Sequence, residues 1–413
     1  MEHMTERLIV KNFLCLEDID IEVKDFLILI GPQAAGKSLC AKLLYFFGTI
    51  YEEITLYHMK GALDELSGFC TILSNRFESF FPSPYWSEQD FYIEYQRNQK
   101  IFFEVKKEKN QEINIYLNQA IQAAAGEITK SFQNIVNKNN NHEITEKLLS
   151  QLSDRYVKVM ASKNIFIPAG RSFFSLLQKN IFKFLQTSNN IDPFLLEFGI
   201  FYEEIKQTGH DIPAEAQTLI HSILKGDYVY AENMLLTDGR KITLELLSSG
   251  QQEALPLALV FVYIISLNLE PYDFTNIYVE EPEAHLFPDA QEQITRLISF
   301  LRYSANHKVT FVITTHSPYM LAAFNNLIKA GNIVKQNPGL KDAVCKIIPE
   351  SMHIDIESFS AYSLKDGRAE SIIDEETCLI NADAIDGVSE NIMEIFNALL
   401  DIEPEDGKAA KNV

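Results

Sequence analysis

The feature that most constrains the fold of this chain is an eight-residue loop, GPQAAGKS at residues 31–38, that lies between two apolar segments. Residues 26–30 (FLILI) form a continuous apolar run, which is typical of a central strand covered on both faces. Residues 39–51 carry apolar side chains at helical spacing. A loop of the form GxxxxGK[ST] in this context predicts an α/β fold that binds phosphate here, rather than a chance glycine-rich turn.

The residues of this loop have distinct expected roles in holding a nucleotide. The glycines let backbone N–H groups turn toward phosphate oxygens, and the start of the following helix adds partial positive charge. We expect Lys37 to reach the β- and γ-phosphates and Ser38 to bind Mg²⁺. The predicted nucleotide-binding residues of the loop are Gly31, Gln33, Ala34, Ala35, Gly36, Lys37, Ser38 and Leu39.

A second apolar strand ends abruptly in carboxylates. Residues 277–279 (IYV) lead directly to Glu280 and Glu281. Because ligand sites in open parallel sheets lie at the carboxyl ends of strands, these acids should face the same crevice as the phosphate loop. We assign Glu280 to hydrated Mg²⁺ and Glu281 to the attacking water, which it would orient or deprotonate. A salt-bridged loop is the alternative.

The segment LSSGQQE at 247–253 precedes a long apolar helix. A helix start of this kind can bind an anion, although Ser-Ser-Gly also caps ordinary helices. The predicted nucleotide-binding residues of this segment are Ser248, Ser249, Gly250 and Gln251.

The apolar run at 309–315 predicts another buried strand, and His316 follows it directly. A histidine at the carboxyl end of a strand, beside a phosphate crevice, can hydrogen-bond a γ-phosphate. A structural histidine is the alternative.

The segment order predicts one α/β domain split by a large, mainly helical insertion. The expected core comprises residues 1–50 and 226–370. The insertion, residues 51–225, should begin with an antiparallel strand pair near 91–108 and continue mainly as helices. Residues 371–413 are expected to form a C-terminal helical segment and tail.

The composition limits the partners of such a domain. The formal net charge of the 413 residues is −21, which argues against a broad basic groove for duplex DNA and leaves direct DNA binding uncertain. The five cysteines are scattered, which fits a reducing compartment. No run of about 18 apolar residues and no leader peptide is evident, so we expect a cytoplasmic protein without membrane contact.

Four segments in this order resemble the motifs of ABC-class ATPases. GPQAAGKS, LSSGQQE, IYVEEPEAHL and TTHSPYML are similar to Walker A, the signature, Walker B with the D-loop, and the switch histidine. The EEPEAHL form is similar to ATPases related to the overcoming-lysogenization-defect (OLD) family and to SMC-like repair ATPases. The resemblance implies an ABC-type ATPase head that hydrolyses ATP with Mg²⁺, with Lys37, Glu281 and His316 as catalytic residues.

In the ABC class, the signature of one subunit completes the nucleotide site of another. The resemblance therefore implies a dimer or higher homo-oligomer in which Ser248 and Gly250 contact the neighbour's γ-phosphate. It also places Ala284 and His285 in a D-loop at the interface. Glu280 departs from the wider pattern, in which aspartate is commoner, and the glutamine of the Q-loop is not placed.

OLD-type nucleases append a Toprim domain, but only about 97 residues follow His316 and no apolar strand precedes Asp383 or Asp386. A built-in nuclease is therefore not expected. The segments at 165–172 (IFIPAGRS) and 359–380 resemble the ATPase subunits of PARIS anti-phage defence systems. This resemblance implies a separate Toprim-type nuclease effector and a phage-encoded trigger protein as partners.

Two alternatives to a defence role stay open, namely an SMC/repair-type DNA-sensing ATPase and, less favoured because of the insertion, a transporter motor. Arg171, in the IFIPAGRS segment, is expected either to approach phosphate or the partner subunit, or to form a structural salt bridge.

Overall fold

The computed structural model describes most residues of the chain. They are residues 5–59, 66–97, 100–109, 111–119, 122, 162–174, 192–206, 212–266, 274–305 and 308–381.

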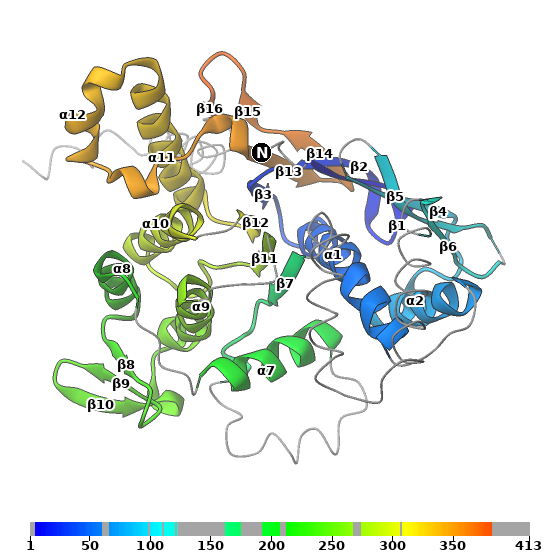
Figure 1. Cartoon of the computed structure of the whole chain (residues 1–413), viewed down its shortest axis with the longest axis horizontal. Coiled ribbons are helices and arrows are strands. Elements are labelled where there is room, and N and C mark those ends of the chain that lie inside the picture. The colour runs from blue at the N-terminus through cyan, green and yellow to red at the C-terminus, as the bar shows by residue number, and fades with distance from the viewer. Residues whose placement is uncertain are drawn as a thin grey trace, which may run out of the picture.

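The described residues contain one large sheet of eleven strands, in the order β6-β5-β4-β1-β2-β14-β13-β3-β12-β11-β7 (Figure 1). Its strands are β1 (Glu6–Phe13), β2 (Leu16–Val23), β3 (Phe26–Ile30), β4 (Phe91–Arg97), β5 (Lys100–Lys107), β6 (Asn114–Leu117), β7 (Ser162–Ile167), β11 (Phe274–Glu280), β12 (Lys308–Thr315), β13 (Phe359–Lys365) and β14 (Arg368–Ser371). The smaller sheets contain β8 (Asp227–Val229), β9 (Met234–Thr237) and β10 (Arg240–Thr243), and β15 (Ile373–Asp374) and β16 (Leu379–Ile380).

The helices connect and cover these strands (Figure 1). They are α1 (Lys37–Met59), α2 (Leu66–Phe80), α7 (Pro193–Ile205), α8 (Ala214–Leu224), α9 (Ser249–Ser266), α10 (Pro288–Ser304), α11 (Pro318–Gln336) and α12 (Lys341–Cys345). Short 3₁₀ turns occur at Ser83–Tyr85, Leu244–Leu246, Pro338–Leu340, Glu350–Met352 and Ile356–Ser358. Among the described helices, none is both long enough and apolar enough to cross a membrane.

One half of the large sheet is parallel. Strands β13, β3, β12, β11 and β7 are parallel neighbours, so their carboxyl ends meet at one edge. The predicted central strand at 26–30 is β3, which pairs with β12 on one side and β13 on the other. The predicted α/β class is therefore confirmed, and the sheet edge that should carry the site is defined.

In the other half of the sheet, β6, β5, β4, β1 and β2 are antiparallel neighbours, and β14 joins β2 to β13. The predicted strand pair near 91–108 is confirmed as β4 and β5, and β4 continues the sheet through its pairing with β1. Strand β7, which also lies within the predicted insertion, pairs with β11. The sheet thus runs without a break through the predicted core and insertion.

In the segment 371–413, the described residues up to 381 form the hairpin of β15 and β16, and the rest of the segment expected to be helical lies outside the described residues. The Asp374 carboxylate accepts hydrogen bonds from the N–H groups of Glu376 and Thr377, which stabilises the turn between the two strands. Asp383, Asp386 and the predicted C-terminal tail lie outside the described residues, as do most of residues 111–160.

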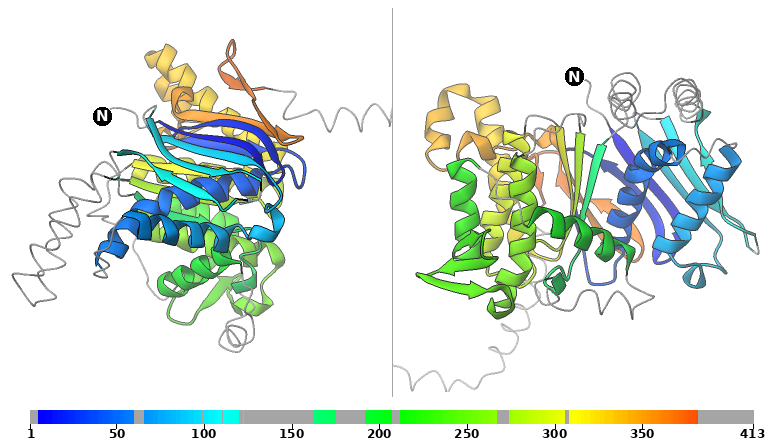
Figure 2. Two further views of the ribbon diagram at one scale, coloured as in Figure 1. Left: turned by 90° about the vertical axis from the view of Figure 1, so that its right-hand side faces the viewer. Right: turned by 60° about the horizontal axis from the view of Figure 1, so that its bottom comes forward.

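Two hydrophobic clusters cover the opposite faces of the parallel strands, and Figure 2 shows α1 and α9 on opposite sides of these strands. Within β3, Phe26 and Ile28 belong to the cluster formed with α9, α10 and α11. Leu27 and Leu29 belong to the cluster formed with α1 and α2. Because successive side chains of a strand point to opposite faces, burial on both faces explains the uninterrupted apolar sequence.

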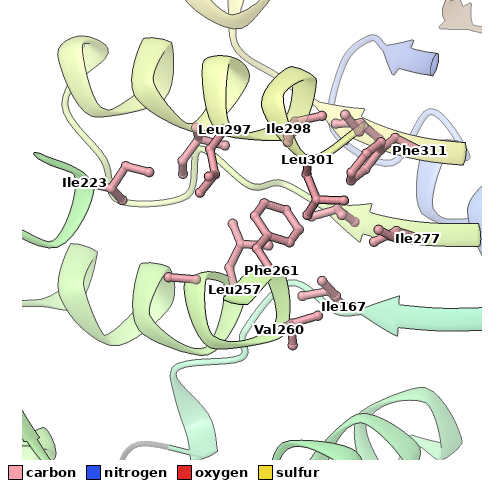
Figure 3. Close-up of a cluster of buried hydrophobic side chains, with 14 of the residues drawn as sticks. Ile167, Ile223, Leu257, Val260, Phe261, Ile277, Leu297, Ile298, Leu301 and Phe311 are labelled. Atoms are coloured by element: carbon pink, nitrogen blue, oxygen red, sulfur yellow. The ribbon is translucent and has the colours of Figure 1, made fainter. Parts of the chain in front are cut away.

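The cluster with α9, α10 and α11 holds the site-bearing elements together. Figure 3 shows Leu257 and Phe261 of α9 and Leu301 of α10 packed toward Ile277 of β11 and Phe311 of β12. All five side chains are at most 1% exposed. This packing holds α9 and α10 against β11 and β12, the strands that lead to Glu280 and His316.

Candidate nucleotide-binding site

Four segments that carry predicted site residues meet at the carboxyl edge of the parallel strands. The loop 31–38 follows β3, Glu280 ends β11, and His316 follows β12. Strand β7 adds a fourth segment, 168–171, at the same edge. The convergence expected from the sequence is therefore present in the fold.

The loop 31–38 has a backbone shape that requires glycine at two positions. Gly31 has φ +151°, and a Cβ there would lie 2.1 Å from the Leu364 carbonyl oxygen. Gly36 has φ +93°, and a Cβ there would lie 2.3 Å from Cδ2 of Leu16. A side chain at Gly31 would push the loop away from β13, and one at Gly36 would strain the backbone and press on Leu16. In this loop Gln33 and Ala34 are exposed, and Ala35, Ser38 and Leu39 are half-buried.

Lys37 begins α1 and folds back over the loop. Its Nζ donates to the carbonyl oxygens of Gly31 and Pro32, both at 2.8 Å. Burial lowers the pKa of Lys37, while the carboxylates of Glu281 and Glu283 act to raise it. The ammonium group thus lies where the loop and the helix start favour an anion.

His316 links Lys37 to Glu281. Its Nδ1 lies 3.4 Å from the Lys37 Nζ, and its Nε2 lies 3.3 Å from Oε1 of Glu281. Because an ammonium group can only donate, Nδ1 must accept, so a neutral His316 carries its proton on Nε2 and can donate it to Glu281. The three residues predicted to be catalytic therefore form one chain of contacts.

Glu281 has an unusual backbone conformation for a residue with a side chain. Its φ is +43°, in the left-handed region, and its N–H donates to the Thr314 carbonyl oxygen at 2.9 Å. Conformations of this kind cost free energy and concentrate at functional sites. The side chain is 37% exposed, so solvent reaches the carboxylate.

Glu280 is buried, with 5% of its surface exposed. Its Oε2 accepts a hydrogen bond from the Ala169 N–H at 3.1 Å, whereas Oε1 has no hydrogen-bond partner among the described residues. Burial raises the pKa of Glu280, and Lys42, the Ala169 N–H and the Ser38 hydroxyl act to lower it.

This environment fits the predicted Mg²⁺ site. A buried carboxylate oxygen without a donor, beside a serine hydroxyl, supplies the hard oxygen ligands that Mg²⁺ prefers. No group of three or more His, Cys, Asp or Glu side chains suited to a metal occurs in the described part of the chain. The protein would therefore contribute Ser38 and Glu280, with phosphate oxygens and water as the other ligands.

Replacing Glu280 by glutamine should stabilise the fold at neutral pH. Because the pKa of Glu280 is raised in the folded protein, ionising this carboxyl lowers the free energy of unfolding. This cost begins as the pH rises above the ordinary carboxyl pKa and is fully present once the pH exceeds the raised pKa. Glutamine removes that cost, so we expect Tm to rise at pH 7 and the difference from the wild type to vanish below the ordinary glutamate pKa. Calorimetry of this variant, with the more exposed Glu281→Gln as control, measures the shift; a lower Tm at pH 7 would contradict it.

The predicted signature segment forms a capping box at the start of α9. Oε1 of Gln251 accepts from the N–H and the hydroxyl of Ser248, and Oγ of Ser248 lies 3.3 Å from the Gln251 N–H. The capping alternative left open by the sequence is therefore observed. Ser248 and Ser249 are nevertheless exposed, so their contact with nucleotide stays a prediction.

Gly250 brings α9 against the predicted D-loop. A Cβ at Gly250 would lie 2.7 Å from the carbonyl oxygen of His285, so a larger residue would push the two segments apart. His285 is exposed and has φ +59°, and Ala284 donates its N–H to the carbonyl oxygen of Glu281. The start of α9 and residues 284–286 thus form one continuous surface.

Glu283 has a role that the sequence reasoning did not assign. It is 8% exposed, and its Oε1 accepts hydrogen bonds from the Thr315 hydroxyl at 2.7 Å and from the His316 N–H at 2.8 Å. It therefore fixes the segment carrying His316 against the segment carrying Glu281. Its signal in the sequence is the third acidic residue of EEPE.

Of the roles left open for Arg171, the structure shows the structural salt bridge. Arg171 is fully buried, and its Nε lies 3.6 Å from Oε2 of Glu253. Local sequence patterns do not predict this burial, because a charged residue after a strand is usually exposed.

Comparison with solved structures finds remote similarities across most of the chain. The Smc head bound to the C-winged helix domain of ScpA is 13% identical, with 89% of this chain and 96% of that chain covered and a TM-score of 0.41. The SMC head domain from Thermotoga maritima is 15% identical, with coverages of 77% and 91% and a TM-score of 0.35. A dimeric bacterial ABC transporter cassette is 10% identical, with coverages of 88% and 96% and a TM-score of 0.31.

Similarities at this level do not assign a function, and no curated protein matches the chain. A family model gives a closer relation. The model of the AAA ATPase domain matches residues 85–321, a segment that includes β7, the start of α9, Glu280, Glu281 and His316. Since the match spans more than half of the length of the chain, the chain belongs to the AAA ATPase domain family.

Proposed function

We propose that this chain is a Mg²⁺-dependent ATPase that binds ATP between two copies of itself. The observation that carries this proposal is the chain of contacts from Lys37 through His316 to Glu281. It joins the phosphate loop, the end of β12 and the end of β11, three segments far apart in the sequence. The buried carboxylate of Glu280 lies at the same edge and supplies the metal-binding oxygen.

The residues support a direct attack of water on ATP. Lys37 would exchange its contacts with the Gly31 and Pro32 carbonyls for phosphate oxygens. Mg²⁺, when bound, neutralises phosphate charge. Glu281 orients a water and takes its proton as the water oxygen bonds to the γ-phosphorus and the bond to the ADP oxygen breaks. His316, donating from Nε2, holds the Glu281 carboxylate in place.

The proposal of a shared site rests on the surface around the signature segment. Within the described residues, Ser248 and Gln251 hydrogen-bond with one another, with the Gln252 N–H and with the Leu224 carbonyl oxygen, and none of these bonds is with the phosphate loop. The start of α9 is thus exposed and does not bind the phosphate loop of its own chain. This arrangement fits a role in binding the nucleotide held by a second copy.

Exposed apolar side chains border the same surface. Leu246 precedes the signature segment and is 77% exposed; Phe287 follows residues 284–286 and is 76% exposed; Tyr319 follows His316 and is 57% exposed. Gln291 ties the last two segments together, because it donates to the Leu286 carbonyl oxygen and accepts from the Ser317 hydroxyl. Large exposed apolar groups gathered in this way favour a protein interface.

Phe287→Asp is expected to weaken ATP-dependent dimer formation. In a Glu281→Gln background, which should retain ATP, a charge at this position should raise the protein concentration needed for dimerisation about 30-fold, because interface aromatics often contribute about 2 kcal/mol. Analytical ultracentrifugation with and without ATP measures this shift.

Ile347→Asp provides the matched control. Ile347 is 77% exposed, as much as Phe287, but it follows α12 and adjoins none of the motifs. Equal effects of the two substitutions, or a dimer that forms without regard to either, would refute an interface at this surface.

We further infer that the ATPase acts as the regulatory subunit of an anti-phage defence complex, most like AriA of the PARIS system. The support is the resemblance of residues 165–172 and 359–380 to that family. The net charge of −21 also disfavours the alternative of a DNA-sensing ATPase. In this role the chain would hold a separate Toprim-type nuclease until a phage-encoded trigger protein is sensed.

Co-expression with a Toprim-type nuclease encoded beside this chain tests the defence role. We expect the two proteins to purify together and to separate when the trigger is present. Hydrolysis that is stimulated by DNA and falls with salt, without such a complex, would instead favour the SMC/repair-type DNA-sensing ATPase.

A further inference from the structure

Arg171 is a fully buried cation at the centre of the candidate site. Its guanidinium group donates to main-chain oxygens from three separate segments. The acceptors are the carbonyl oxygens of Glu253 at 2.8 Å from Nε, Pro168 at 3.2 Å and Glu280 at 2.9 Å from Nη1, and Glu281 at 3.1 Å and Pro282 at 3.5 Å from Nη2. A buried charge persists only when it is satisfied in this way.

These contacts join α9, the helix that begins in the predicted signature segment, to the main chain of the residues that carry the predicted catalytic carboxylates. Glu253 lies in α9, just after the turn that carries Ser249 and Gly250. Glu280 and Glu281 are the predicted metal ligand and base. The Glu253 carboxylate, 3% exposed, lies 3.6 Å from Nε and reinforces the attachment of α9.

The geometry suits the transmission of small movements. Arginine presents its donors in a rigid planar fork. Here Nε, Nη1 and Nη2 all donate to main-chain carbonyl oxygens, which move less freely than side chains. A displacement of residues 280–282 would therefore move the start of α9, and the reverse would also hold. Lysine has one point charge and cannot span the same acceptors.

We infer that Arg171 is a positioning residue that couples nucleotide occupancy at one site to the signature turn serving the other. The inference rests on the proposed shared ATP site. In a pair of chains, Glu280 and Glu281 act on one nucleotide while Ser248 and Gly250 of the same chain face the second. The Arg171 fork connects them directly, beside the contact of Gly250 with His285, so each site would sense the state of its neighbour.

Hydrogen exchange in a monomeric variant tests the coupling directly. The parent protein carries Glu281→Gln, to retain ATP, and Phe287→Asp, to weaken docking of a second copy, and is used at a concentration at which ultracentrifugation shows it to be monomeric. We expect Mg²⁺ and ATP to slow exchange at residues 277–283 and, through Arg171, also at 249–255, by at least about fivefold at each. Adding Arg171→Met should abolish the response at 249–255 and preserve that at 277–283.

Two further variants separate coupling from loss of stability. Arg171→Lys keeps the buried cation but not the fork, and should also lose the response at 249–255; it decides the matter if Arg171→Met does not fold. Arg97→Met removes another buried arginine, 3% exposed and paired with Glu6 in the antiparallel half of the sheet. It should keep both responses.

The exchange rates at 249–255 and at 277–283 test the coupling and the ATP site separately. A response at 249–255 that survives both Arg171 substitutions, or that is lost equally in Arg97→Met, overturns the coupling. A parent that responds at 277–283 alone overturns it as well, while leaving ATP binding supported. A parent that responds at neither segment contradicts the proposed ATP site, and the coupling fails with it.

Discussion

Glu281→Gln is expected to lower the rate of ATP hydrolysis about 10²- to 10⁴-fold, the usual contribution of a positioned general base. The carboxylate lies 3.3 Å from Nε2 of His316 and is reached by solvent, which is the environment a water-activating group needs. Glutamine keeps the size of the side chain but loses its charge and basicity. ATP should still bind, because Lys37, Ser38 and the loop 31–38 are unchanged.

Phosphate release and equilibrium binding of a fluorescent ATP analogue measure the two properties separately. Glu292→Gln serves as a control, because Glu292 is also partly exposed and pairs with Arg296 on α10, away from the loop 31–38. Hydrolysis by Glu281→Gln at the wild-type rate would show that another group activates the water.

Lys37→Ala is expected to weaken ATP binding about 100-fold, since each charge-assisted hydrogen bond to phosphate contributes about 1.5–3 kcal/mol. The substitution also removes the donor that the carbonyl oxygens of Gly31 and Pro32 share. Calorimetric titration with ATP measures the loss. Lys341→Ala, which breaks an exposed ion pair with Glu350 near α12, should bind ATP normally. Unchanged affinity in Lys37→Ala would remove the basis for the phosphate site.

The parts of the fold that the sequence predicted correctly depend on local patterns. The strand at 26–30, the loop 31–38 and the strand ends at Glu280 and His316 each combine an apolar run with a change of residue type. Parallel strands then bring their carboxyl ends together, which is a general property of such sheets. The convergence of the site could therefore be predicted from separate segments.

The parts that could not be predicted depend on contacts between distant residues. The pairing of β1 with β4 joins Glu6 to Arg97, and nothing in either segment specifies the other. Arg171 is buried only because carbonyl oxygens from three segments meet around it. Glu283 likewise gains its role from Thr315 and His316 on another strand. The Ser248 capping box was different, because its S-x-x-Q spacing is local.

The most direct test of the shared site mixes two inactive variants. Lys37→Ala disables the phosphate loop, and Ser248→Asp keeps an effective helix cap while placing a carboxylate against the partner's phosphate. In a mixed dimer, one site contains both defects and the other contains neither. We predict that hydrolysis, absent from each variant alone, returns on mixing; a mixture that associates yet stays as inactive as its components would contradict an ATP held between two chains.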